Sequence, residues 1–140
     1  MFGGMGSGMG GSKNRHKKAT PPLYDFKLSN IVKLSHTSFP NEKTRLPYLV
    51  EFYTPWCEHC KALANTWEKV AVSLKGLVKV GALDAEKEEV IAQKMGIEGF
   101  PTIKMHIENQ WLDYNGKKTV KSLRSWALEQ IPMKYRPTSC

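Results

Sequence analysis

The segment Trp56-Cys57-Glu58-His59-Cys60 holds the residues of this 140-residue chain whose types and spacing could do chemistry. Cysteines at i and i+3 lie on one side of the first turn of a helix, close enough to form a disulfide. The apolar run before them predicts a strand that leads into this helix and places Cys57 at its N-terminus. Unpaired backbone N–H groups and the helix dipole favour a thiolate there, so Cys57 is predicted to be the attacking nucleophile. The pattern indicates thiol–disulfide exchange.

Cys60, one turn into the helix, is predicted to be the more buried cysteine, which resolves the mixed disulfide that Cys57 forms. The alternative is half of a structural zinc site, which needs about two further ligands at suitable spacing. Cys140 and His106 are distant in the sequence and unpaired, so a redox pair with no metal and no separate cofactor is expected. Cys140 itself is either an exposed thiol or half of an intermolecular or interdomain disulfide.

Length and charge limit the classes of protein to which this chain can belong. A chain of 140 residues fits one domain that can form its core without structural disulfides. The net charge of +8 is mostly in the tails, because residues 23–133 hold 15 Lys/Arg and 13 Asp/Glu. Basic tails can bind nucleic acid or anionic lipid but are more often solvated linkers, so neither a nucleic acid nor a membrane is expected as a partner. We also expect no transmembrane run, signal peptide or C-terminal retention tetrapeptide in this chain.

Strands and helices are predicted to alternate through a domain over residues 23–133, between a Gly/Met-rich and basic linker at 1–22 and a tail at 134–140. Apolar runs predict the strands, and apolar residues at helical spacing predict the helices. The order indicates an α/β sandwich with a mixed central sheet. The predicted strands are Ile31–Leu34, Leu46–Tyr53, Leu77–Leu83, Thr102–His106 and Trp111–Tyr114; the predicted helices run from Glu58 to about Lys75, over Asp84–Met95 and over Lys118–Gln130. The helix faces expected to be buried hold Leu63, Trp67, Val70, Ala71 and Leu74, and Val120, Leu123, Trp126 and Ala127.

Two segments together resemble a catalytic domain of the protein disulfide-isomerase family. They are Leu49–Lys61, with its W-C-x-H-C motif, and the downstream run Gly99-Phe100-Pro101-Thr102-Ile103-Lys104. The resemblance covers roughly residues 26–131 and implies a thioredoxin-like three-layer sandwich, with helices on a mixed central β-sheet. It also implies an enzyme of the endoplasmic reticulum lumen that oxidises, reduces or isomerises disulfides. Its partners would be unfolded or misfolded clients with cysteines, and glutathione or an upstream oxidase.

The resemblance assigns roles to the neighbours of Cys57. The imidazolium of His59 would stabilise the thiolate and favour the oxidising, isomerase-like end of the family. Glu58 replaces the family's usual glycine, and a carboxylate beside the thiolate is expected to make the site less oxidising. Trp56 would flank the disulfide as part of an apolar substrate surface, with core packing as the alternative.

By the same resemblance, Glu51 is the family's buried carboxylate. A buried lone charge has a raised pKa, and Glu51 would exchange a proton with Cys60, through water. An edge-exposed glutamate is the alternative. Ala82 stands where the founding members have a lysine beside this carboxylate, so Glu51 is expected to lack a cationic partner.

Pro101 resembles the family's cis-proline, which would turn the backbone of Phe100 toward an extended substrate. Lys118 replaces an arginine that approaches the buried cysteine and lowers its pKa.

These residues leave other functions open. A client-holding module would use the groove around Trp56, Phe100 and Pro101, whereas the paired cysteines favour an enzyme. His59 disfavours a cytosolic thioredoxin-type reductase. The glycine-rich start leaves open a redox module in a larger co-chaperone of the endoplasmic reticulum.

Overall fold

Strand β2 (Tyr48–Tyr53) lies at the centre of a five-stranded sheet because nearly all of its side chains are buried. The computed structural model describes residues 22–132, so Cys140, the predicted tail and all but the end of the predicted linker lie outside the described residues. The strand order is β1-β3-β2-β4-β5. β1 (Val32–Leu34) and β3 (Lys79–Asp84) are parallel to β2, whereas β4 (Thr102–Ile107) runs antiparallel to β2 and to β5 (Gln110–Asp113). The sheet is mixed, as predicted.

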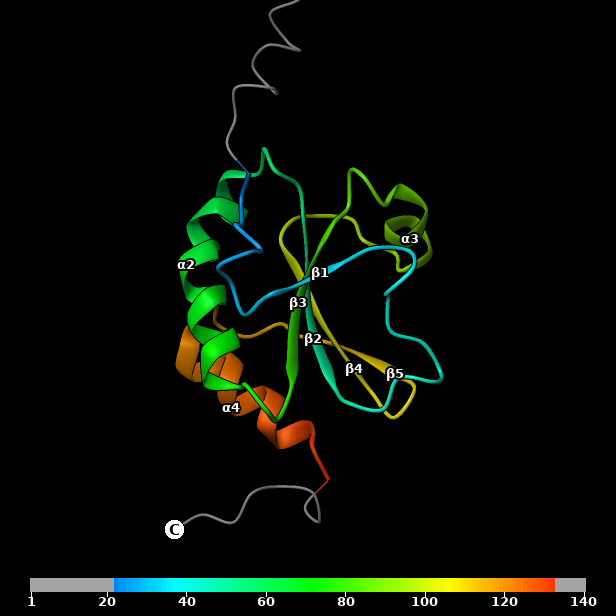
Figure 1. Cartoon of the computed structure of the whole chain (residues 1–140), viewed down its shortest axis with the longest axis vertical. Coiled ribbons are helices and arrows are strands. Elements are labelled where there is room, and N and C mark those ends of the chain that lie inside the picture. The colour runs from blue at the N-terminus through cyan, green and yellow to red at the C-terminus, as the bar shows by residue number, and fades with distance from the viewer. Residues whose placement is uncertain (1–21, 133–140) are drawn as a thin grey trace, which may run out of the picture.

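Helices cover both faces of this sheet, which gives three layers (Figure 1). α2 (Glu58–Ser73) and α4 (Val120–Gln130) pack together on one face, and the short α3 (Glu89–Lys94) lies on the other. The predicted apolar face of α2 is buried in full, with Trp67 completely enclosed. On α4, Leu123 and Ala127 are buried as predicted, but Val120 and Trp126 are only half-buried. The buried α2 face anchors the helix that carries both cysteines.

Several predicted boundaries are wrong for local reasons. α3 begins at Glu89 rather than Asp84, because the Asp84 carboxylate accepts hydrogen bonds from the next backbone N–H groups and forms a turn. α4 begins at Val120 rather than Lys118, because the Thr119 hydroxyl caps it. A capping side chain therefore fixes the start of α4, whereas the N-cap residue of α3, Glu88, makes no side-chain capping hydrogen bond. No helix among residues 22–132 is long and apolar enough to cross a membrane.

Several strand boundaries also differ from the prediction. β4 and β5 meet in a two-residue turn at Glu108-Asn109, where both φ angles are positive, as tight hairpins require. β4 therefore extends to Ile107, and β5 starts before Trp111 and ends at Asp113. The other strands differ from prediction by one or two residues: β1 and β2 start later, and β3 is shifted toward Asp84.

Candidate active site

Cys57 and Cys60 differ in how far solvent reaches them. Cys57 is the N-cap residue of α2, and its sulfur accepts a hydrogen bond from the Cys60 backbone N–H at 3.1 Å. Cys57 is half-buried, whereas Cys60 is 0% exposed, and both are free thiols. A turn closed by the Cys57 N–H and the Thr54 carbonyl connects β2 to the helix. A disulfide of another protein can therefore reach Cys57 but not Cys60.

The surroundings of Cys60 favour its neutral thiol. Burial raises the pKa of Cys60 above its ordinary value, and the hydrogen bond with Cys57 and the charge of Glu51 add to the effect. A hydrogen bond with the backbone of Thr54 acts in the opposite direction. Cys60 therefore needs a nearby base before it can attack a disulfide.

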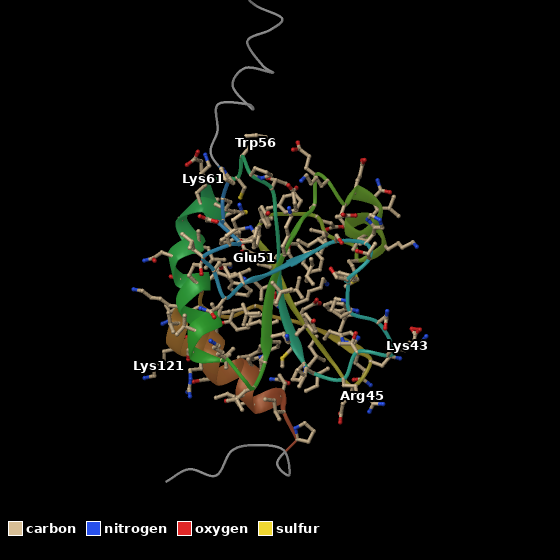
Figure 2. All side chains as sticks on the ribbon, in the orientation of Figure 1. Lys43, Arg45, Glu51, Trp56, Lys61 and Lys121 are labelled. Carbon is tan, nitrogen blue, oxygen red and sulfur yellow. The ribbon has the colours of Figure 1, made fainter. Side chains whose placement is uncertain are left out.

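Glu51 lies at the centre of the molecule (Figure 2) and is 0% exposed, which excludes the edge-exposed alternative. Burial raises its pKa from an ordinary value of 4.5 to about 7, while a hydrogen bond from Tyr24 lowers it. Ala82 lies opposite Glu51 on β3, as the sequence suggested. The carboxylate nevertheless has a neutral partner, because the Tyr24 hydroxyl donates to its Oε1.

Sequence reasoning missed Tyr24. The available signal was a tyrosine in the short segment Leu23-Tyr24-Asp25-Phe26, between the linker and the first strand. Tyr24 is buried, and its ring meets that of Tyr53 edge-on at 5.5 Å between centroids. Nothing in its spacing indicated that it would contact a glutamate 27 residues later.

The predicted surface residues separate into two groups. His59, Phe100, Pro101 and Lys118 line one pocket of about 400 Å³ beside α2, together with Ala62, Leu63 and Thr66. The Phe100–Pro101 peptide bond is cis, as the resemblance implied. Lys118 is exposed. The pocket therefore carries an aromatic wall and cationic or titratable groups.

Trp56 and Glu58 are not among the lining residues of that pocket. Trp56 lies at the end of the molecule where α2 begins (Figure 2), half-buried, and its indole N–H donates to the Glu86 carboxylate at 3.0 and 3.2 Å. This contact orients the indole at the surface rather than in the core. Among residues 22–132, no three His, Cys, Asp or Glu side chains gather to hold a metal ion.

Replacing Glu58 with glycine is expected to make the Cys57–Cys60 pair more oxidising, because a charge that opposes the thiolate is lost. The change should be less than about 30 mV, which corresponds to about 1.4 kcal/mol. The Glu58 side chain is 85% exposed and lies 3.6 Å from the Lys61 ammonium, so solvent and a countercharge weaken its effect. Glutathione titration of both proteins measures the potential, and Lys61→Met should move it in the opposite direction. A potential that falls in Glu58→Gly contradicts the prediction.

Comparisons with known proteins agree with this geometry. The family model described as Thioredoxin matches residues 30–129. "Protein disulfide-isomerase 2-3" of Arabidopsis thaliana is 44% identical over 106 residues, and "Protein disulfide-isomerase A6" of Homo sapiens is 39% identical over 106 residues. These matches cover 74% and 73% of this chain and 24% of each relative, so the chain spans about a quarter of their length.

Solved structures of similar fold also belong to thioredoxin-type domains. The first thioredoxin domain of mouse protein disulfide-isomerase A4 has a TM-score of 0.68 and 31% identity, over 78% of this chain and 81% of that one. The J-Trx1 fragment of ERdj5 has a TM-score of 0.67 and 27% identity, over 71% of this chain and 51% of that one. The fold, the order of the motifs and these relatives agree, and the chain belongs to the thioredoxin family as a domain of the protein disulfide-isomerase type.

Proposed function

We propose that this chain is a thiol–disulfide oxidoreductase domain that acts on the disulfides of folding proteins. The observation that carries the proposal is the asymmetry of the cysteine pair. Cys57 is accessible at the N-terminus of α2, whereas the side chain of Cys60 is buried. The Cys60 backbone N–H donates a hydrogen bond to the Cys57 sulfur. One sulfur is placed to meet a client, and the other is placed to release it.

The reaction moves one electron pair and needs no further group. In the reducing direction, the Cys57 thiolate attacks a client disulfide, and one client cysteine leaves as a thiolate. Cys60 then loses its proton to Glu51 and attacks the Cys57 sulfur, so that the second client cysteine leaves. The client is reduced and the Cys57–Cys60 disulfide forms. In the oxidising direction the same steps run backward, and isomerisation combines them without net electron transfer.

Isomerase activity is the finer part of the proposal. It is supported by His59 between the cysteines and by relatives named as protein disulfide-isomerases. The pocket lined by Phe100 and Pro101 would hold an extended client segment, and exposed Lys118 would lie at its rim. Glutathione or an upstream oxidase would regenerate the pair. The endoplasmic reticulum lumen is the compartment that fits this chemistry, since its poise of about −180 to −210 mV tolerates disulfides.

A second candidate is a redox module of a larger co-chaperone that mainly reduces or holds clients. The likeness to the J-Trx1 fragment of ERdj5 favours it, together with the Gly/Met-rich start of the chain, which resembles linkers that follow J domains. The two candidates differ in what remains when the sulfurs are removed. A Cys57→Ser, Cys60→Ser double variant that still suppresses client aggregation would support the holding role.

The reduction potential of the Cys57–Cys60 pair tests the function directly. Titration in glutathione buffers, followed by tryptophan fluorescence, is expected to give a reversible two-electron transition near −180 mV, the value of an isomerase. A value near −270 mV, typical of thioredoxin, would instead assign the reductase role. The Cys57→Ser variant is the matched control and should show no transition. A chain without a reversible transition would contradict the oxidoreductase proposal itself.

A further inference from the structure

A buried hydroxyl–carboxylate pair connects the N-terminal segment to the reaction centre. Segment 22–31 runs beside α2 (Figure 1), and the Ser29 hydroxyl ties it to this helix by donating to Glu68 Oε1 at 2.8 Å. Tyr24, in this segment, is only 4% exposed and donates its hydroxyl hydrogen to Glu51 Oε1. Tyr24 precedes residues 30–129, the part of the chain that the family model matches. The contact to Glu51 therefore comes from outside the matched region.

The pair leaves one carboxylate oxygen without a partner. Glu51 Oε2 is buried and makes no hydrogen bond within residues 22–132. A buried polar atom without a hydrogen bond destabilises the folded protein, so its presence calls for a physical role. The titratable groups that interact with Glu51 are Tyr24 of the N-terminal segment, Tyr53 of β2 and Cys60 of α2, whereas β3 and β4 place the uncharged Ala82 and Ile103 opposite it.

We infer that Tyr24 is a positioning residue for proton exchange between Glu51 and Cys60: its hydroxyl holds Oε1 and leaves Oε2 free for the Cys60 proton. The inference rests on the proposed oxidoreductase function. When Cys60 attacks the mixed disulfide, the new bond joins its sulfur to that of Cys57, and the bond between Cys57 and the client sulfur breaks. The Cys60 proton goes to Glu51, the electron pair leaves on the client thiolate, and Glu51 later returns the proton to solvent.

Tyr24 also sets the pH at which Glu51 is ionised. Burial raises the pKa of Glu51 to about 7 against the lowering effect of the Tyr24 hydrogen bond. Removing the hydroxyl removes only the lowering effect, so the pKa rises further. A larger share of Glu51 is then protonated at neutral pH and cannot accept the proton of Cys60.

A cavity lies beside the pair. It has a volume of about 440 Å³, and its lining includes Tyr24, Tyr53 and Ala82, but not Glu51. Tyr24 is hydrogen-bonded to the carboxylate, and Ala82 lies opposite it in the sheet. Tyr24 and Ala82 therefore border both Glu51 and this space, and the Tyr24 hydroxyl is the group that is hydrogen-bonded to the carboxylate.

The test follows the two thiol exchanges separately. The reduced protein, with Cys140→Ala so that only the pair reacts, is mixed with 5,5′-dithiobis(2-nitrobenzoate), and the released chromophore is recorded by stopped flow. Cys57 releases the first chromophore, and the attack of Cys60 on the adduct releases the second. In Tyr24→Phe the pH midpoint of the second phase is expected to move up by about one unit. The second phase at pH 7 then slows about fivefold, because the ionised share of Glu51 falls from about a half to about a tenth.

Matched variants separate positioning from packing. Tyr53→Phe removes a hydroxyl from the same aromatic cluster and should leave the midpoint in place. In a Glu51→Gln background, Tyr24→Phe should have no further effect on the second phase. A wild-type protein without a second phase would overturn the proposed function. If the wild-type protein shows the second phase but its pH midpoint does not move in Tyr24→Phe, only the proposed role of Tyr24 is overturned. This holds whatever stability the variant loses.

Discussion

Replacing Cys60 with serine is expected to stop turnover while leaving the first thiol exchange intact. Cys57 stays accessible at the start of α2, so it still attacks a client disulfide, but no neighbouring thiol releases the adduct. Turnover should fall at least about 100-fold, because a well-placed neighbouring group acts at an effective concentration of about 10⁵ M or more, far above any thiol in solution. Insulin reduction measures the turnover, and mass spectrometry under non-reducing conditions measures the trapped mixed disulfide.

The other cysteines provide the controls for the trapping experiment. Cys57→Ser should lose turnover equally but form no adduct, because buried Cys60 cannot reach a client. Cys140→Ala should behave like the unmodified chain in both assays. An adduct that forms in Cys57→Ser, or a Cys60→Ser variant that turns over at the normal rate, would contradict the roles assigned to the two sulfurs.

The sequence predicted the elements of the fold more reliably than their ends. Periodicity identified the buried face of α2, because Leu63, Trp67 and Val70 recur at helical spacing and pack on the sheet. The start of α3 was missed, because the Asp84 side chain accepts hydrogen bonds from the Glu86 and Lys87 N–H groups and a turn precedes the helix. Periodicity averages over many residues, whereas a capping or turn contact depends on one side chain.

The site residues were also only partly predictable from the sequence. The spacing of Cys57 and Cys60 was sufficient to predict which sulfur is buried, because position in a helix follows directly from the sequence. The partner of Glu51 was not predictable, because Tyr24 reaches it through the path of the N-terminal segment. The roles of His59, Lys118 and Trp56 remain predictions. The structure brings His59 and Lys118 to one pocket and leaves Trp56 outside it.

Replacing Glu51 with glutamine is expected to stabilise the protein at alkaline pH and to leave its stability nearly unchanged at pH 4.5. The pKa of Glu51 is raised from an ordinary 4.5 to about 7 in the folded state, so the folded protein holds this proton more tightly than the unfolded chain. The free energy of unfolding therefore falls as the pH rises from about 4.5 to about 7. The full cost is present above pH 7 and amounts to about 3 kcal/mol for a difference of this size.

Urea unfolding of both reduced proteins between pH 4.5 and 8.5 measures this cost as the difference between their free energies. Glu98→Gln, at an exposed glutamate, is the matched control for the substitution itself. A difference that is the same at both ends of the range would mean that Glu51 does not titrate there. Because glutamine cannot accept the Cys60 proton, the stabilised variant should also resolve mixed disulfides more slowly. Gained stability and lost resolution in one variant would show that the buried carboxylate is kept for proton exchange at a cost in stability.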